Sequence, residues 1–480
     1  MDFKKQVIKS TKWNSLATVF NLGFQFLKLI VLTRLLDKSD FGLVAIATMV
    51  ISFTSIFSDL GFTIAIIHKQ DTTEKQYSSL YWANVLFSVL LFLLVVGISP
   101  LVASFYNEKQ LTIIIPLLAI EILANAFGKM FQTLKMKSLD FKFISIVSVS
   151  CTILGFIVTI ILALISFGVY SLVIGQLAQV LMVQSVYMIT GRKSVKISLH
   201  FNVQEIKDYI IIGSYGLGAK VVDFAASKID VFLIGRFFGM EALGVYNLAK
   251  ELIAKPYSIL GKIFYNIGVS AFAIIQNNIN AIKEKLNLVL NSISLITAPL
   301  YVLVAVFADL IVPIIYSNSF GELIPLVRIL AVFGFMSSLE FASFSVRDAK
   351  GKTNYSLLWT SSLFIITVLT TYLLKDTSVY ILAFAISAVS VITIVPFWYI
   401  NIYKTIGVSF FDFLRPIIMN AILAIVLGMA VYFLYSWNHS IYMVIALAVS
   451  YSALYLLGEI VLNKQTLLKV KDILLKKGNN

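Results

Sequence analysis

Two long apolar segments, residues 209–238 and 241–275, carry more charged side chains than a lipid environment tolerates. Deep inside them stand Lys220, Asp223, Lys228, Asp230, Arg236, Lys250, Glu251, Lys255 and Lys262. Each segment can cross a bilayer, but a Lys, Arg or Asp at the centre of a lipid-facing helix costs roughly 2.5–3.5 kcal/mol. We therefore expect these side chains to pair or to line a water-filled cavity, where basic groups can bind anions and carboxylates can carry protons or cations.

The composition of the whole chain is that of a membrane protein. Of its 480 residues, 59% are hydrophobic and 13% are charged, with a mean hydropathy of +0.92, whereas soluble proteins carry about 25% charged residues. Apolar runs recur near the roughly 20 residues that a hydrocarbon core demands. We predict an all-α polytopic membrane protein with about fourteen transmembrane helices, at residues 14–36, 41–67, 78–98, 111–134, 143–165, 168–190, 209–238, 241–275, 287–312, 323–347, 355–374, 379–401, 415–435 and 440–462.

The net charge of +14 would suit a nucleic-acid-binding protein, but the positions of the charges indicate a membrane topology instead. Between the predicted spans, 25 Lys and Arg residues fall on one side and only Lys38, Lys109 and Lys375 on the other. The positive-inside rule therefore places both termini in the cytoplasm, and this distribution removes the reason to expect a nucleic-acid partner.

The chain contains an internal repeat. Arg34 precedes Gly42 by eight residues, and Arg236 precedes Gly244 by eight, at an offset of 202. Two parallel six-span halves follow, a design of transporters that hold the substrate between the halves. The predicted organisation is an N-terminal lobe 1–195, an interfacial cytoplasmic connector 196–208, a C-terminal lobe 209–401, two extra helices 402–463 and a basic tail 464–480.

Polar residues form narrow stripes on spans 1, 2 and 4 and on their repeat-mates 7, 8 and 10. Mutual ion pairing could explain part of this pattern, Ser and Thr are common helix-packing residues, and Arg34 and Arg236 could extend to the outer interface. Pairing does not explain the imbalance of ten basic side chains within the spans against six deep acids. An excess of positive charge predicts an anionic guest of the phosphate or pyrophosphate class.

Enzyme signals are absent from the sequence. It contains no P-loop, no dinucleotide-binding glycine motif, no HExxH and no GxSxG. Three scattered histidines make no metal site, and the single Cys151 allows no internal disulfide. We therefore expect a secondary transporter without a resident cofactor.

The stretch LTRLLDKSDFGLVAIATMVISFTSIFSDLGFTIAIIHKQ and its echo KIDVFLIGRFFGMEALGVYNLAKEL resemble the bacterial polysaccharide-transporter (Wzx-like) flippases. Their superfamily also holds the MATE multidrug exporters and the lipid II flippases. The resemblance implies two six-helix lobes related by a pseudo-two-fold axis around a central cationic cavity that opens alternately to the two sides. It also implies a guest of undecaprenyl-diphosphate-linked oligosaccharide, moved outward across the bacterial inner membrane for surface polysaccharide synthesis.

Within that framework we assign candidate roles to individual residues. The candidates for holding the diphosphate are Lys28, Arg34, Lys220, Arg236, Lys255 and Lys262. The candidates for contacting sugar hydroxyls are Asn21, Gln25 and Asn125. The candidates for coupling to an H⁺ or Na⁺ gradient are Asp59, Asp223, Asp230, Glu251 and Glu340. The expected partners are the lipid-linked oligosaccharide, membrane lipids and other polysaccharide-assembly proteins, a polymerase among them.

Other functions remain open from the sequence. A MATE-like antiporter of cations or drugs would need a net acidic cavity, which the charge count disfavours. A lipid II flippase would share the fold and the diphosphate. A membrane glycosyltransferase, polymerase or ligase would need a larger external loop than the roughly fifteen residues around 308–322. A non-transporting scaffold would leave the charged stripes as ion-pair networks.

Overall fold

A computed structural model describes residues 3–58, 63, 66–67, 69, 71–193, 195–214, 217–437 and 440–462. Over these ranges the chain is helical and forms no strand. The ion-coupling candidate Asp59 and the basic tail 464–480 lie outside the described residues.

The chain forms two compact units. The first comprises Met1–Asn247 with Ile314–Phe320, and the second comprises Leu248–Pro313 with Gly321–Asn480. The division falls inside helix α10 (Gly239–Ile274) rather than at the connector. The predicted lobes, which end at residue 195 and begin again at residue 209, divide the chain differently from these compact units, and they stay a prediction.

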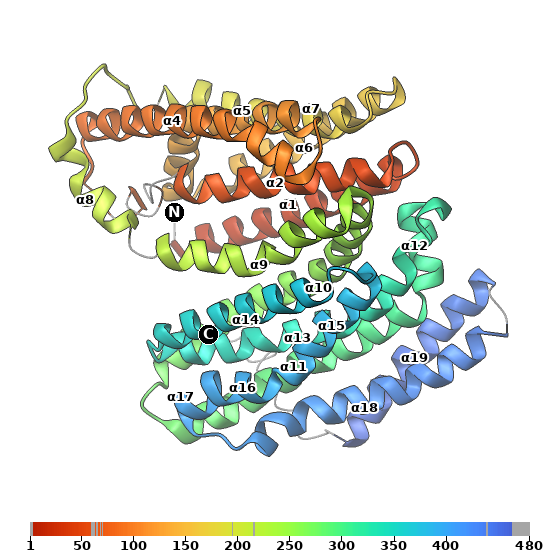
Figure 1. Cartoon of the computed structure of the whole chain (residues 1–480). Helices are drawn as coiled ribbons and strands as arrows, with labels where there is room; N and C mark the ends of the chain where they lie inside the picture. The colour runs from red at the N-terminus through yellow and green to blue at the C-terminus, as the bar shows by residue number, and fades with distance from the viewer. Residues whose placement is uncertain are drawn as a thin grey trace. The chain divides into compact units, whose positions relative to one another are not determined.

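The helices of each unit can be followed along the colour ramp of Figure 1. Those of the first unit are α1 (Phe3–Leu32), α2 (Lys38–Ser58), α4 (Glu74–Tyr106), α5 (Leu111–Lys137), α6 (Phe141–Leu164), α7 (Val169–Gly191), α8 (Val203–Ser214), α9 (Leu217–Phe237) and the start of α10. Those of the second unit are the rest of α10, α11 (Ile279–Val306), most of α12 (Ala308–Tyr316), α13 (Leu323–Ala349), α14 (Thr353–Leu373), α15 (Val379–Ile392), α16 (Ile394–Trp398), the π-helix η2 (Tyr399–Tyr403), α17 (Lys404–Ile406), α18 (Phe410–Tyr435) and α19 (Ile441–Leu462).

Twelve described helices are long and apolar enough to cross a membrane. The pair formed by α15 and α16–α17 passes the same test as one span bent by 41°. Helix α9 is as long as α2, at 21 residues, but five charged side chains set it apart from the twelve. With the bent pair counted, thirteen described spans pass this test, and the predicted span 209–238 corresponds to the end of α8 and to α9.

Several helices begin where the sequence supplies an N-cap. Thr73 and Gln76 form a capping box at the start of α4, with the Gln76 N–H donating to the Thr73 hydroxyl and the Thr73 N–H to the Gln76 amide oxygen. Such side chains bind the N–H groups that the first turn of a helix leaves without a partner. The other capping residues of this kind are Asp140, Asn278, Ser378 and Ser409.

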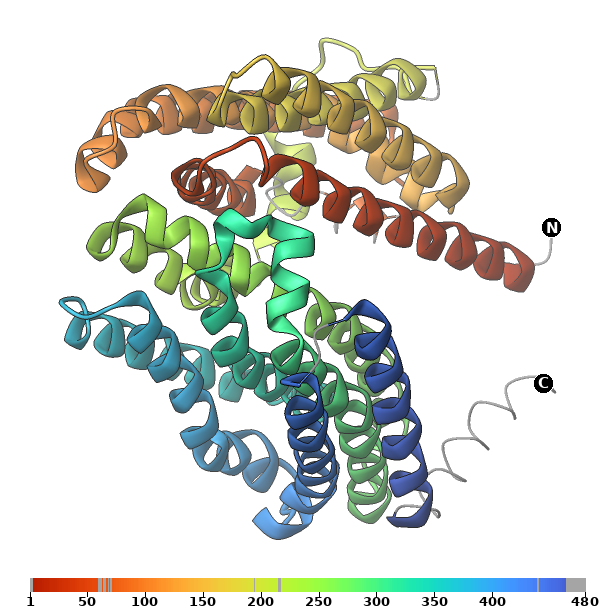
Figure 2. The ribbon, with the colours of Figure 1, turned by 90° about the vertical axis from the view of Figure 1, so that its right-hand side faces the viewer.

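In the first unit, α4, α5 and α7 run side by side, and α6 packs against α1 and α7 (Figures 1 and 2). Close approach between α6 and α7 depends on glycines. A Cβ at Gly175 would overlap the Thr159 hydroxyl, and a Cβ at Gly155 would overlap Gln179. Small residues at such contacts are typical of membrane helix packing, because the driving force there is van der Waals contact.

The glycines of the sequence repeat meet in the structure. A Cβ at Gly42 would overlap the backbone carbonyl oxygen of Met240, and a Cβ at Gly244 would overlap that of Lys38. Lys38 and Met240 are separated by the same 202 positions as the two glycines. The beginnings of α2 and α10 therefore make one backbone contact twice, as two-fold symmetry requires. The Lys38 ammonium also lies 3.5 Å from the Glu241 carboxylate.

In the second unit, α11 packs along both α13 and α18, and α18 packs against α19 (Figures 1 and 2). The polar contacts between α11 and α18 are fully buried. The Asn420 amide donates to the side chain of Asn291 at 2.8 Å and to the Ser294 hydroxyl at 2.6 Å. The two helices outside the repeat are thus fixed to the unit by hydrogen bonds as well as by apolar packing.

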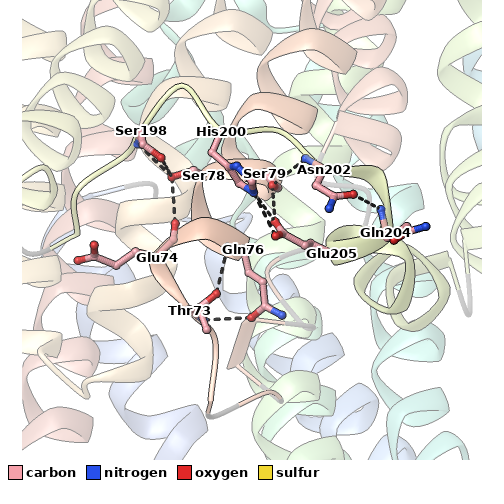
Figure 3. Close-up of polar contacts among 10 residues, drawn as sticks. All are labelled: Thr73, Glu74, Gln76, Ser78, Ser79, Ser198, His200, Asn202, Gln204 and Glu205. Carbon is pink, nitrogen blue, oxygen red and sulfur yellow. Dashed lines mark hydrogen bonds and ion pairs between the residues drawn. The ribbon is translucent and has the colours of Figure 1, made fainter.

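The connector between α7 and α8 is fastened to the first two turns of α4 (Figure 3). The Ser198 N–H donates to the Ser78 hydroxyl at 3.0 Å, and the Asn202 N–H donates to the Ser79 hydroxyl at 3.1 Å. Ser79 in turn donates to the Glu205 carboxylate at 2.7 Å, and the His200 ring nitrogen lies 3.0 Å from the same carboxylate. Hydrogen bonds therefore hold the connector against α4.

The carboxyl group of Glu205 supplies a pH-dependent part of this attachment. Hydrogen bonds from Ser79 and then His200, with the nearby charge of Lys75, lower the pKa of Glu205 below its ordinary value of 4.5. A lowered pKa in the folded protein stabilises the fold at pH values above 4.5, and this stabilisation is lost as the pH falls through the folded-state pKa. We expect Ser79→Ala to lower the unfolding temperature at pH 7 and to have a smaller effect near pH 3, where only the hydrogen bond from the Asn202 N–H remains to be lost in full.

Thermal unfolding in detergent as a function of pH tests this prediction. The matched control is Ser78→Ala, which removes a hydroxyl bound to Ser198 but not to Glu205. Its effect should not change between pH 7 and pH 3. A Ser79→Ala effect that is equally independent of pH would contradict the role assigned to Glu205.

Candidate functional site

The predicted diphosphate ligand Lys28 lies in α1, within the electrostatic reach of Glu121 on α5. Glu121 is a buried residue and also lies beside Gln176 of α7. Burying two opposite charges next to each other offsets part of their desolvation cost. The negative charge of Glu121 therefore offsets part of the positive charge that Lys28 offers to an anion.

The two repeat arginines lie at helix ends and already have partners. The Arg34 guanidinium donates to the backbone carbonyl oxygens of Ile30 and, at 3.1 Å, of Ile314. The Arg236 guanidinium carbon lies 5.1 Å from the centre of the Phe105 ring, a cation–π arrangement. Both side chains are exposed, so each anchors a helix end while it remains accessible.

Helix α9 has an exposed charged face and a buried acid. Lys220 and Asp223 are exposed, whereas Asp230 is only 5% exposed. The Tyr246 hydroxyl donates to Asp230 at 2.7 Å, and the Val231 N–H donates to it at 2.9 Å. Two hydrogen bonds satisfy a buried carboxylate in part and hold it in one geometry. Asp230 thus fixes α9 to α10, and Asp223 is the more accessible of the two candidates.

The predicted sugar-contacting amides are spread through the first unit. Asn21 donates from its amide nitrogen to the Ser148 hydroxyl at 2.9 Å. Asn125 accepts a hydrogen bond from the Gln184 amide at 2.7 Å. Gln25 is exposed on α1. Asn21 and Asn125 therefore join helices to each other, and Gln25 is the one of the three whose side chain is turned outward.

The remaining candidates on α10 belong to the second unit. Glu251 and Lys262 are exposed, and Lys255 is half-buried and followed directly by Pro256. A proline within a helix removes one backbone hydrogen bond and favours a bend at this point. Because Lys220 belongs to the first unit, its meeting with Lys255 and Lys262 around one cavity stays a prediction.

A small cavity in the second unit is lined by the ion-coupling candidate Glu340. Ser390 and Thr393 line it as well, and Thr393 stands at the bend between α15 and α16. The remaining lining is apolar, from Met336, Leu339, Ile394, Phe397 and Phe413. A carboxyl group beside two hydroxyls and a broken helix can bind a proton or a small monovalent cation.

Closer to the C-terminal end of α13 lies a buried network centred on Arg347, which is 4% exposed. Its guanidinium donates to Asp348 at 2.8 Å and to the Asn401 side chain at 3.0 Å, and it lies 4.5 Å from the centre of the Phe344 ring. The Tyr265 hydroxyl of α10 donates to Asp348 at 2.8 Å. The network therefore joins α10, α13 and the π-helix η2, and its positive charge interacts with Glu340.

Three polar residues of this arrangement were not among the sequence candidates. Gln176 and Gln184 were overlooked because α7 carries no charge in its apolar stretch, although amides at positions 176, 179 and 184 form a sequence signal. Arg347 was placed at the cytoplasmic end of the polar stripe of span 10, but it was not assigned to a site. In the structure it lies in the last turn of α13, where cations interact favourably with the helix dipole.

Some known proteins are similar to this chain in sequence, and others are similar in fold. A family model described as "Polysaccharide biosynthesis protein" matches residues 31–325. The teichuronic acid biosynthesis protein TuaB of Bacillus subtilis (strain 168) is 27% identical over 88% of this chain and 88% of its own. The lipopolysaccharide biosynthesis protein WzxC of Escherichia coli (strain K12) is 24% identical over 74% of this chain and 72% of its own.

Among solved structures, the lipid II flippase MurJ in an inward closed conformation superposes with a TM-score of 0.76 at 13% identity, over 94% of this chain and 99% of that one. At this identity the likeness concerns the fold alone, and it confirms the predicted all-helical architecture. The family match covers more than half of the chain. The chain therefore belongs to this family of membrane-embedded polysaccharide biosynthesis proteins.

Proposed function

We propose that this protein moves undecaprenyl-diphosphate-linked oligosaccharide from the cytoplasmic to the outer leaflet of the bacterial inner membrane, for the synthesis of a surface polysaccharide. The observation that carries the proposal is the family match over residues 31–325 in a chain with a flippase fold. Neither comparison names the substrate of this chain. The excess of basic residues within the spans supplies the argument for a diphosphate.

The geometry narrows the basic residues that would hold the diphosphate. Lys28 interacts with Glu121, and the two arginines bind carbonyl groups or an aromatic ring. Lys220 and Lys262 are exposed and Lys255 is half-buried. We assign the main diphosphate contacts to Lys220, Lys255 and Lys262 because they lie in the two most highly charged spans, in a cavity that opens alternately to the cytoplasm, where we place both termini, and to the outside. Gln25 would meet the sugar, and a polymerase would take the product.

Transport uphill needs an energy source. Asp59, Asp223, Glu251 and Glu340 are the groups proposed to bind the coupling H⁺ or Na⁺, with Glu340 in the better defined site because two hydroxyls line its cavity. The positive charge of Arg347 would repel a coupling cation, and only the deprotonated form of Glu340 would offset that repulsion. Cation binding would therefore depend on the protonation of Glu340. A carboxylate of this kind can favour one of two conformations according to its occupancy.

A flipping assay tests the proposal. In proteoliposomes that contain fluorescent undecaprenyl-diphosphate oligosaccharide, Lys220→Ala/Lys255→Ala should lower the flipping rate at least about tenfold, since a hydrogen bond to a charged group contributes about 1.5–3 kcal/mol. The matched control is Lys109→Ala, an exposed lysine outside the spans. Flipping at the wild-type rate by the double variant would refute the assignment of these lysines.

The same vesicles address the alternative substrates. Selective flipping of lipid II, with no movement of the oligosaccharide-bearing lipid, would make the protein a lipid II flippase. Proton-driven uptake of cationic dyes without flipping would make it a MATE-like exporter.

A further inference from the structure

The connector between α7 and α8 carries some apolar side chains that the protein covers and others that are exposed. Val195 and Ile197 pack against the buried cluster at the start of α4, which also holds Ile206 and Tyr209 of α8. The next three apolar side chains, Leu199, Phe201 and Val203, are exposed, and Val203 is the first residue of α8. Leu199 is 93% exposed, Phe201 49% and Val203 62%. Leu199, Phe201 and Val203 form an apolar strip that the protein leaves uncovered, directly after a part of the connector that it covers.

The backbone of the strip is held at a defined level along α4 (Figure 3). Besides the contacts of Ser78 and Ser79, the Trp82 ring nitrogen donates to the Ser198 carbonyl oxygen at 2.9 Å. Ser198 therefore lies alongside the first two turns of α4, next to Leu199. The apolar strip is fixed at this position along α4, because the backbone of the connector is hydrogen-bonded to side chains of that helix.

The position of the strip along α4 corresponds to the edge of the bilayer. Helix α4 has 33 residues and is thus about 50 Å long, whereas a hydrocarbon core of about 30 Å needs about 20 of them. The nearly unbroken apolar run of α4 begins at about Leu80, between the anchoring residues Ser79 and Trp82. The strip therefore lies at the boundary between headgroups and acyl chains, where tryptophan is itself enriched.

The charges around the strip are basic. The exposed cations next to it are Arg192, Lys193, Lys196 and Lys207. Glu205, which is bound by Ser79 and His200, keeps its negative charge, but the four cations outnumber it. Basic side chains near an anionic membrane surface are attracted to its phosphates.

We propose that residues 192–207 form a docking surface for anionic phospholipid. Leu199, Phe201 and Val203 insert between the headgroups of the cytoplasmic leaflet, and the four basic side chains bind the phosphates of lipids gathered around them. Because the surface is fastened to α4, its lipids are held against the first unit. The occupant is lipid rather than a soluble protein because the strip lies at the depth of the headgroups and carries the complementary charge.

A single-cysteine fluorescence experiment tests the proposal. In a Cys151→Ser background, Leu199→Cys carries a bimane label in nanodiscs that contain a minor fraction of phosphatidylglycerol. Either the phosphatidylglycerol or the bulk phosphatidylcholine is brominated near the headgroup. At equal bromine content, we expect brominated phosphatidylglycerol to quench the label at least twofold more strongly, and Lys193→Gln/Lys196→Gln/Lys207→Gln to remove the difference.

The matched control is a label at Gln110→Cys, which is exposed in an extracytoplasmic loop and should show no preference between the two lipids. Quenching of Leu199→Cys by aqueous iodide but by neither lipid would overturn the proposal and favour a soluble partner. Equal quenching by both lipids would overturn it as well, because the surface would then lack anionic selectivity. Phosphatidylglycerol retained by the purified wild-type protein, and lost from the triple variant in native mass spectra, provides a label-free readout.

Discussion

Gly42→Ala should lower the free energy of unfolding by about 1–3 kcal/mol, as expected for a side chain forced into a filled space. The added Cβ would overlap the carbonyl oxygen of Met240. That oxygen belongs to helix backbone, which cannot move aside as a flexible side chain can. Gly244→Ala should have a similar effect, since its Cβ would overlap the Lys38 carbonyl oxygen. Thermal or urea unfolding in detergent measures both variants.

The controls for this prediction are glycines in open surroundings. A Cβ at Gly23 in α1 or at Gly97 in α4 would meet no atom within 4 Å. Alanine is favoured over glycine in a helix interior by roughly 0.5–1 kcal/mol, so these variants should be as stable as the wild type or more stable. If Gly42→Ala matched Gly97→Ala in stability, the reciprocal contact would not be a constraint on the fold.

Arg347→Ala should destabilise the protein by about 3–5 kcal/mol, the range for breaking a buried ion pair by removal of one partner. The substitution would leave Asp348 and the side chain of Asn401 without the guanidinium that they bind. Tyr265→Phe, which removes a single hydrogen bond to Asp348, should cost about 1 kcal/mol. Unfolding in detergent at pH 7 measures both changes.

Arg415→Ala is the control for Arg347→Ala, because Arg415 is another arginine near a helix end but is exposed. Its removal should change the stability by less than about 0.5 kcal/mol. Should Arg347→Ala fail to accumulate in the membrane, Arg347→Lys retains the charge but loses the two-sided guanidinium contact, and we expect an intermediate loss. An Arg347→Ala protein as stable as Arg415→Ala would contradict the role of the network.

The spans and the repeat could be predicted from the sequence because the bilayer imposes strong and local rules. A helix must supply about 20 apolar residues whatever its neighbours are. Residues 379–401 were predicted as one span, and they form the bent pair whose break lies at Thr393. The spacing of Arg34 and Gly42, repeated by Arg236 and Gly244, correctly indicated equivalent elements.

The partners of the polar residues could not be predicted in the same way. A stripe on a helix gives a face but not the helix opposite that face. Lys28 was assigned to a ligand, yet Glu121 lies within its electrostatic reach from a helix about ninety residues away in sequence. Asp230 was assigned to ion coupling, and its hydroxyl partner Tyr246 belongs to the next helix. Such pairs depend on the rotation of each helix, which is set by packing between helices.

The reciprocal contact of Gly42 and Gly244 is what a symmetric dimer of half-length chains would make, with each copy supplying the same residues to the other. Joining two such copies into one polypeptide removes the requirement that they remain identical. Lys28 and Asp230 stand at equivalent positions with opposite charges. A homodimer would have to carry the same residue at both of these positions, two lysines or two aspartates, whereas the fused chain can use its two halves as a hetero-pair.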